Sequence, residues 1–224
     1  MRWPHYISSV LFNISQEVIV MIMVFLSIFG SIAFAASGAI VAIQQKYDLF
    51  GIFILGIATS FAGGLIRNLV IGIQVTMIWH QSTLFFAAIA TIIVVILTPG
   101  FWIKKGAKWI TILDAIGLST FSVQGALLAN RVHATLILIV VAAMFTGIGG
   151  GVLRDLLAQR QPIVFQKEIY ALWTILVGIV VGMHWVQPQS EWQIYSLIIL
   201  TFILRMTSVK LHLKLPSIKI NHSL

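Results

Sequence analysis

The sequence predicts an all-α integral membrane protein with seven transmembrane helices, arranged as an inverted repeat of three plus three helices and a seventh helix. Composition indicates the class: 59% of the 224 residues are hydrophobic and 9% are charged, whereas soluble domains carry about 25% charged residues. An internal repeat indicates the arrangement, and an uneven distribution of lysine and arginine indicates the orientation. The mean hydropathy of +1.03 fits a chain whose apolar surface is covered by a bilayer.

Seven apolar segments have about the length that a bilayer requires. We expect helices at roughly 18–43, 50–71, 83–103, 109–129, 135–158, 169–187 and 193–209. Pro99-Gly100 and Pro188 are plausible helix breakers near the ends of the third and sixth segments. The expected divisions are a lead-in (1–17), a first repeat (18–103), a second, inverted repeat (104–190), a seventh helix (191–209) and a basic, partly disordered tail (210–224).

The two repeats are related by a constant offset. Arg67 and Arg154 are 154 − 67 = 87 positions apart, and each follows a cluster of glycines. The same offset, without a gap, pairs Gly30 with Gly117, Phe34 with Phe121, Gly38 with Gly125, Leu69 with Leu156 and Gln74 with Gln161. A unit of three helices crosses the membrane an odd number of times, so the second copy must run in the opposite sense. Inverted repeats of this kind enclose a site near the midplane of the membrane.

Lysine and arginine are concentrated on one side of this topology. The side of the N-terminus holds two of them, Arg2 and Arg131. The opposite side holds ten: Lys46, Lys104, Lys105, Lys108, Arg160, Lys167, Arg205, Lys210, Lys214 and Lys219. Because cytoplasmic loops carry the excess of positive charge, we expect the N-terminus outside and the C-terminus in the cytoplasm of a plasma (inner) membrane.

The feature that points to function is a glycine cluster followed by charge, deep in apolar sequence. Gly149, Gly150 and Gly151 precede Arg154 and Asp155, and Gly63 and Gly64 precede Arg67 and Asn68. We expect the glycines to break the second and fifth helices, which frees backbone carbonyls and amides to line an ion pathway. The alternative is that these small residues only let helices approach each other closely.

The charged residues also have two interpretations. Arg67 and Arg154 either line the pathway or extend along helix ends to reach the membrane surface. Asp155 pairs with an arginine or with a passing cation. Because Asn68 occupies the matching position, the expected site has one carboxylate between two arginines. Asp114 is interpreted as an interfacial helix-start residue.

Polar side chains in the same segments are either contacts between helices or further parts of a pore wall. The candidates for the wall are Ser37, Ser60, Ser119, Gln124 and Thr146. Isolated histidines (His80, His133, His184), the acidic residues Glu17 and Glu168, and the tryptophans at 79, 102, 109, 185 and 192 are expected at the membrane interfaces. The sequence contains no cysteine and no catalytic or metal-binding motif, so we expect neither an enzyme nor a cofactor, and no nucleic-acid partner.

At these residues the sequence resembles a known family. The stretch Gly149–Asp155, its degenerate first copy and the run Phe34–Ala39 look like the prokaryotic trimeric intracellular cation (TRIC) channels, whose domain is also labelled a glycine transporter. The resemblance covers roughly residues 18–209. It implies a homotrimer, one water-filled pore in each protomer lined by the second and fifth helices, and conduction of monovalent cations, chiefly potassium. This sequence departs from the pattern at Asn68, where the motif has Asp, and at Val75, where the second copy has Pro162.

Three hypotheses follow from the sequence. The first is a passive potassium-permeable channel. The second is a secondary transporter of glycine or another small amino acid, because helix N-termini beside an arginine suit a substrate carboxylate. The third, a membrane scaffold, explains the apolar surface but leaves the charges within the membrane unexplained.

Overall fold

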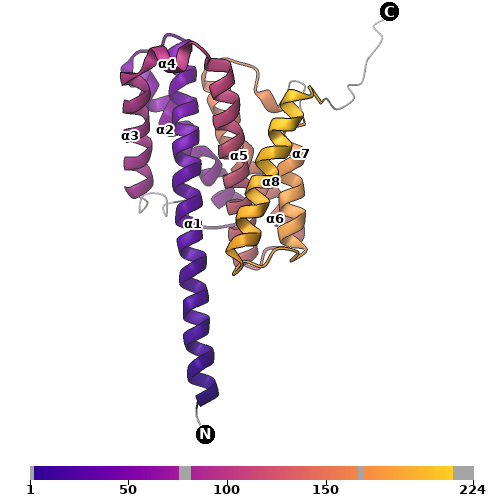
Figure 1. Ribbon diagram of the computed structural model, residues 1–224. Helices are drawn as coiled ribbons and strands as arrows, with labels where there is room; N and C mark the ends of the chain where they lie inside the picture. Colours follow the sequence, from indigo (N-terminus) through magenta and orange to yellow (C-terminus); the bar gives the residue numbers. More distant parts are fainter. Residues whose placement is uncertain (1–2, 76–81, 166–168, 214–224) are drawn as a thin grey trace, which may run out of the picture.

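The structure, a computed structural model, describes residues 3–75, 82–165 and 169–213, with residues 3–19 in backbone only (Figure 1). These residues form eight α-helices and a 3-10 turn, and they include no strand. The elements are α1 (Trp3–Gln44), α2 (Leu49–Val70), α3 (Ser82–Leu97), α4 (Pro99–Ile103), α5 (Gly106–Arg131), α6 (Leu136–Leu157), η2 (Ile163–Phe165), α7 (Ala171–Gly182) and α8 (Glu191–Lys210). The all-α prediction is confirmed.

Helix boundaries repeat at the same offset as the sequence. Asp48 caps α2 by accepting a hydrogen bond from the backbone N–H of Gly51 at 2.7 Å, and Thr135, 87 positions later, caps α6. Such caps satisfy backbone donors that the first helical turn leaves unpaired. Lys46 and His133, also 87 positions apart, both take the left-handed conformation that ends a helix, with φ of 59° and 55°. The α1–α2 and α5–α6 connections are therefore built alike.

The two halves of the bundle run in opposite directions. In Figure 1, α1 and α3 run upward and α2 downward, whereas their counterparts α5 and α7 run downward and α6 upward. The last helix, α8, packs against α5 and α7. At the centre, α1 packs against α2 and α5, and α6 packs against α2 and α5, so these four helices form the contact between the halves. The structure thus has the inverted arrangement that the odd number of helices in each repeat predicts.

Three predicted boundaries differ from the structure. The third segment is not one helix but two, α3 and α4, separated at Thr98 next to Pro99, because a proline removes a backbone donor and restricts the residue before it. The predicted lead-in is part of α1, which begins at Trp3. The sixth segment is shorter than expected, since α7 ends at Gly182, before Pro188. The tail from 214 onward, with Lys214 and Lys219, lies outside the described residues, as do Arg2, Trp79, His80, Lys167 and Glu168.

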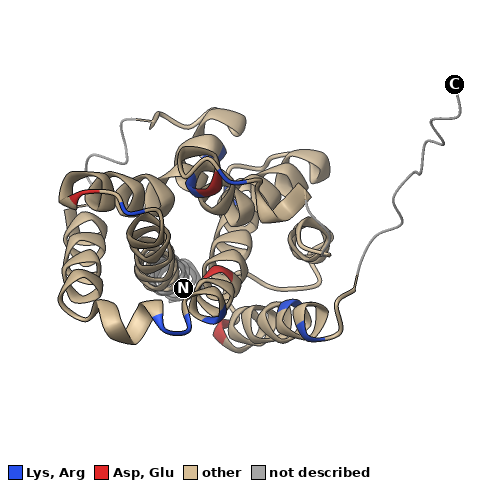
Figure 2. Cartoon of the chain, turned by 90° about the horizontal axis from the view of Figure 1, so that it is seen from above, with Lys and Arg blue, Asp and Glu red and all other residues tan. Residues whose placement is uncertain are grey.

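The helices are long and apolar enough for a multi-pass membrane protein. Five of them have the length and composition to cross a bilayer, counting α1 from Val20, and α3 and α7 are shorter apolar helices. The connections α1–α2, α3–α5 and α6–α7 and the end of α8 lie at one end of the bundle (Figure 1). Figure 2 views the molecule along this axis, with its lysines and arginines in blue. The described basic residues at this end are Lys46, Lys104, Lys105, Lys108, Arg160 and Lys210, and Arg131 lies at the opposite end of α5. Arg205, predicted at the basic surface, is instead buried in α8.

Candidate functional site

The glycine clusters do not break their helices, and this prediction was wrong. Both α2 and α6 continue as α-helix through Gly63 and through Gly149–Gly151. A glycine inside a helix costs only about 1 kcal/mol relative to alanine, and here close packing compensates for that cost. A Cβ added at Gly149 would stand 3.1 Å from the Cα of Gly63, and one added at Gly63 or Gly150 would overlap a backbone carbonyl of the facing helix. The glycines therefore let the backbones of α2 and α6 touch where the helices cross.

Two phenylalanine rings lie beside this crossing. The rings of Phe34 on α1 and Phe121 on α5 pack with their centroids 5.4 Å apart. Phe34 fills the space over Gly117 and Gly150, and Phe121 fills the space over Gly30. Both rings are almost completely buried. The centre of the bundle is therefore an apolar layer that separates its two ends.

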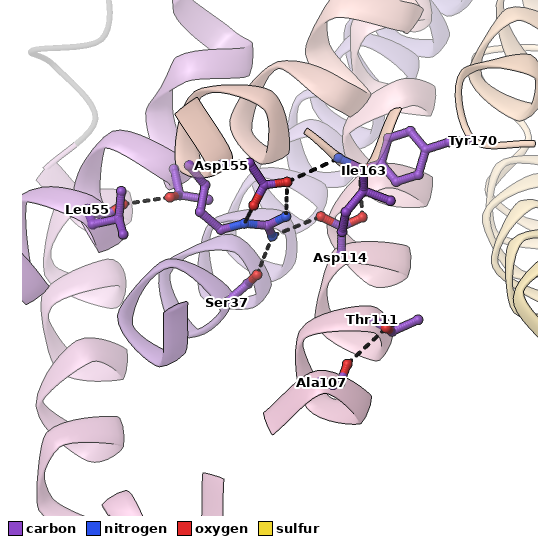
Figure 3. A network of polar contacts seen from close by, with 10 residues as sticks. Ser37, Leu55, Ala107, Thr111, Asp114, Asp155, Ile163 and Tyr170 are labelled. Atoms are coloured by element: carbon purple, nitrogen blue, oxygen red, sulfur yellow. Dashed lines mark hydrogen bonds and ion pairs between the residues drawn. The ribbon is translucent and has the colours of Figure 1, made fainter. Parts of the chain in front are cut away.

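A charged centre lies toward one end of the crossing, around Arg154 of α6. The guanidinium of Arg154 forms two ion pairs. Its Nη1 lies 3.0 Å from a carboxylate oxygen of Asp114 on α5, and its Nε lies 3.0 Å from one of Asp155. It also donates to Ser37 of α1 at 2.5 Å. Figure 3 shows Asp114, Asp155 and Ser37 converging from three helices. Arg154 is 0% exposed, so an arginine that is costly to place in a membrane is fully paired inside the protein.

Asp114 is not the interfacial residue that the sequence suggested. It is 0% exposed, pairs with Arg154 and accepts a hydrogen bond from the Tyr170 hydroxyl at 2.5 Å. The Tyr170 ring in turn lies 4.5 Å from the guanidinium carbon of Arg205 on α8. Sequence reasoning missed the roles of Asp114, Tyr170 and Arg205. For Asp114 a signal existed: the 87-residue offset matches it to Ser27, a position of α1 one turn before Gly30 and Ser31.

A second centre lies at the opposite end of the crossing, around Arg67 of α2. Arg67 donates from Nε and Nη2 to the side-chain oxygen of Asn68, at 3.0 and 2.9 Å, and from Nη1 to Gln124 of α5 at 3.4 Å. The Gln124 amide donates to the hydroxyl of Ser27 on α1. Arg67 is 6% exposed, and no described carboxylate forms an ion pair with it. Its centre is polar but has no compensating charge among the described side chains.

The two centres are copies of each other, position by position. The offset of 87 pairs the four residues of the Arg67 centre with those of the Arg154 centre: Arg67 with Arg154, Asn68 with Asp155, Ser37 with Gln124 and Ser27 with Asp114. Each arginine thus donates to the next residue in the sequence and to a residue of the other half, Gln124 of α5 for Arg67 and Ser37 of α1 for Arg154. Both carboxylates belong to the Arg154 centre, whose four residues have a formal charge of 1 − 2 = −1, whereas those of the Arg67 centre carry +1. The buried Arg205 lies outside the four, on the ring of Tyr170. The single-carboxylate site expected from the sequence is corrected by Asp114.

A small polar cavity borders the Arg67 centre. It has a volume of about 30 Å³, and its lining includes Ser27, Ser31, Ser60, Gly64, Arg67 and Gln124. A Cβ added at Gly64 would have one neighbouring atom within 4 Å, the Nη2 of Arg67 at 3.8 Å. This glycine therefore faces open space. Gly64 therefore differs from Gly63: it borders a cavity and does not support helix packing.

The hydroxyls of the remaining candidates for the pore wall, Ser60, Thr146 and Ser119, donate to backbone carbonyls. Ser60 donates to the carbonyl of Ser31 at 2.8 Å and lines the cavity. Thr146 donates to its own helix at Ala142, and its carbonyl faces Gly63. Ser119 lies apart from both centres, in an apolar groove of about 500 Å³ between α1, α5 and α8. The described residues contain no group of three or more metal-binding side chains.

Comparison with known proteins agrees with this duplicated architecture. The family model described as "Glycine transporter" matches residues 24–99 and again 111–186. Both ends of the two segments differ by 87 positions (111 − 24 and 186 − 99), which is the offset of the two arginines.

Relatives and solved structures cover most of the chain. The chain is 45% identical over 192 residues to the membrane protein YvgT of Bacillus subtilis (strain 168), covering 86% of this chain and 94% of YvgT. It is 30% identical over 209 residues to the inner membrane protein YadS of Escherichia coli (strain K12), covering 91% and 99%. A crystal structure of a prokaryotic TRIC channel superimposes with a TM-score of 0.79 at 33% identity, covering 88% of this chain and all of that one. The chain therefore belongs to the prokaryotic trimeric intracellular cation channel family, whose domain is also described as a glycine transporter.

Proposed function

We propose that this protein is a potassium-permeable cation channel of the inner membrane, with one pathway in each protomer. The observation that carries the proposal is the pair of polar centres at opposite ends of the α2–α6 crossing, one of which has a formal charge of −1. A net negative centre within a low-dielectric bundle attracts cations and repels anions. The solved channel that this chain resembles supports the assignment to cations.

The proposed pathway follows α2 and α6, with α1 and α5 completing its wall. It runs from the Arg67 cavity, past the layer of Phe34 and Phe121, to the Arg154 centre. In the described conformation the phenylalanines and the glycine contact close it, since Arg154, Asp114 and Asp155 are 0–1% exposed. Opening then requires α2 and α6 to separate at their crossing. The glycines suit this motion, because the contact between them involves few side chains that must repack.

The assembly and orientation are part of the same proposal. A homotrimer follows the name of one solved relative, the TRIC trimeric intracellular cation channel orthologue from Rhodobacter sphaeroides, which is 27% identical to this chain with a TM-score of 0.76. The N-terminus is placed outside and the C-terminus in the cytoplasm. This orientation rests on the excess of lysine and arginine at the end of the bundle where α8 finishes.

The test is planar-bilayer recording of the purified full-length protein under a potassium chloride gradient. We expect resolved unitary currents that reverse close to the potassium equilibrium potential. Currents that reverse near the chloride potential, or no unitary steps from protein shown to be folded and inserted, would contradict a potassium channel.

A second candidate is a secondary transporter of glycine, favoured by the description of the family model and by the unpaired charge of Arg67, which suits a carboxylate. The described cavity of about 30 Å³ is far smaller than the about 300–1,000 Å³ of typical ligand pockets, which favours an ion over an amino acid. Uptake of radiolabelled glycine into proteoliposomes, without unitary currents, would support the transporter instead.

A further inference from the structure

The cavity beside Arg67 borders Gly64, whose counterpart in the second copy, Gly151, borders a tyrosine. In the second copy, a Cβ added at Gly151 would stand 3.1 Å from the hydroxyl of Tyr170. This hydroxyl donates a hydrogen bond to Asp114. The equivalent residue of the first copy is Thr83, since 170 − 87 = 83, and Thr83 is exposed. Gly64, the counterpart of Gly151, therefore faces the cavity of about 30 Å³ in place of a phenol ring.

The two centres also differ in what faces each guanidinium. In the second copy the position beside Arg154 is taken by the carboxylate of Asp114, at 3.0 Å, together with that of Asp155. In the first copy these positions hold the hydroxyl of Ser27 and the amide of Asn68. The polar residues in the lining of the cavity are Arg67, Gln124, Ser27, Ser31 and Ser60. The hydroxyls of Ser27 and Ser60 already donate to the backbone carbonyls of Met23 and Ser31, so the donors left for a ligand are N–H groups of Arg67 and the hydroxyl of Ser31.

Arg67 has donor capacity left for a ligand. A guanidinium has five N–H groups, and three of the hydrogen bonds of Arg67 go to Asn68 and Gln124, so 5 − 3 = 2 of its N–H groups have no acceptor among the described residues. The bond to Gln124 is long, at 3.4 Å. A positive charge that is 6% exposed and paired only with neutral groups is costly in a membrane.

We propose that the cavity beside Arg67 binds a small inorganic anion of the size of chloride, which takes the place that the Asp114 carboxylate holds in the second copy. Its volume accommodates about two water-sized particles, so a monatomic anion with a water molecule fits and an organic acid does not. The anion neutralises Arg67 and removes a positive charge that repels cations at this end of the pathway. Cation conduction then depends on the anion present, a consequence that rests on the proposed channel function.

Binding is tested without reference to conduction, by thermal unfolding of the purified full-length protein at constant potassium. Chloride or bromide salts are compared with potassium gluconate, whose anion is too large for the cavity. An anion that binds only the folded state multiplies the folded-to-unfolded ratio by 1 + [anion]/Kd, about tenfold at nine times Kd. We expect this stabilisation in the wild type.

Three variants show where the anion binds. Arg67→Gln removes the positive charge, and Ser27→Asp introduces the carboxylate that the second copy already has, so the difference between chloride and gluconate should disappear in both. Arg131→Gln makes the same change at an exposed arginine and should respond as the wild type does. The proposal is overturned if chloride stabilises the wild type, Ser27→Asp and Arg131→Gln equally, and this comparison holds even if Arg67→Gln does not fold. It is also overturned if the wild type is equally stable in chloride and in gluconate.

Conduction gives the second measurement. Replacing chloride by gluconate at fixed potassium should lower the unitary potassium conductance of the wild type about tenfold, the effect of 1.4 kcal/mol in the barrier, and should leave Ser27→Asp unaffected by the anion. Equal sensitivity of both proteins would overturn the role of the anion in conduction. If neither protein conducts in any salt, the channel function fails, while the unfolding measurements still decide whether the anion binds.

Discussion

Replacing Asp155 by asparagine changes the charge of the Arg154 centre while keeping its shape. Asp155 accepts from Nε and Nη2 of Arg154 at 3.0 and 3.2 Å, and Asn68 accepts from the same two atoms of Arg67 at 3.0 and 2.9 Å. The first copy thus shows that one amide oxygen can accept both N–H groups of the arginine. Asp155 uses both of its oxygens, and its Oδ2 also accepts from the backbone N–H of Ile163 at 3.3 Å. Breaking a buried ion pair usually costs about 3–5 kcal/mol. Because Asp114 still pairs with Arg154, we expect Asp155→Asn to lower the free energy of unfolding by only about 1.5–3 kcal/mol, the range of one charged hydrogen bond.

The same substitution should also affect ions. Asp155→Asn changes the formal charge of the centre from −1 to 0. A unit charge about 8 Å from a passing cation contributes about 2 kcal/mol at an effective dielectric of 20, which corresponds to roughly 30-fold in cation occupancy. Unitary conductance and the preference for potassium over chloride should both fall. The matched change in the other copy, Asn68→Asp, adds a negative charge beside Arg67 and should leave the potassium preference equal or higher.

Reversal potentials under a potassium chloride gradient measure this preference, together with the unitary conductance of each variant. The denaturation midpoint in detergent shows first that Asp155→Asn is folded. If a folded Asp155→Asn has the reversal potential and conductance of the wild type, the Arg154 centre does not lie on the pathway. Its charges then only hold α1, α5 and α6 together, and loss of folded protein would be the main consequence of altering them.

Four further predictions use simpler measurements. Gly63→Ala should destabilise the protein by about 1–3 kcal/mol, because its Cβ overlaps the facing helix. Gly64→Ala should be neutral or stabilising by up to about 1 kcal/mol, because its Cβ enters open space. Equal shifts of the denaturation midpoint would show that the two glycines do not differ in packing. Tyr170→Phe removes the donor to Asp114 and should cost about 1–3 kcal/mol in the same assay; an unchanged midpoint would show that the bond is not formed. Reporter fusions should be active in the cytoplasm at the C-terminus only, and cytoplasmic activity at the N-terminus would reverse the assigned orientation. Native mass measurement in detergent should find trimers, and a purely monomeric protein would contradict the proposed assembly.

Much of the fold could be predicted because the membrane simplifies the pattern. Apolar length identifies the spans, and a constant offset reveals duplication without any knowledge of packing. The offset also related Arg67 to Arg154 correctly, since in the structure they hold equivalent positions and each donates to the side chain of the next residue. Local rules failed where neighbouring helices decide the outcome. Pro99 divides the third segment more sharply than expected, and the glycines, poor helix formers by themselves, remain helical because α2 and α6 bury them against each other.

The error on Asp114 has the same physical origin. A carboxylate near the start of a predicted helix is normally at the membrane surface, where it favours the helix N-terminus. In the structure α5 begins at Gly106, so Asp114 lies two turns inside the helix and meets Arg154 of α6. Sequence position along one helix cannot show that an arginine from another helix faces it. The repeat offset contains this information indirectly, since it matches Asp114 to Ser27 and thereby to the neighbourhood of Arg67.

Duplication followed by divergence explains why one centre is locked and the other has a cavity. In an exact duplication the two arginines would have had identical partners and both centres the same charge. Here both carboxylates and the tyrosine that reinforces them belong to the Arg154 centre, whereas the Arg67 centre has neutral partners and open space. The formal charge is −1 at the Arg154 centre and +1 at the Arg67 centre. The two charges sum to zero, but each end of the α2–α6 crossing is charged. An ion entering at the Arg67 end therefore meets a positive charge before it reaches a negative one. Passage of a cation requires that this first charge be screened, either by the bound anion that we propose or by movement of the Arg67 side chain.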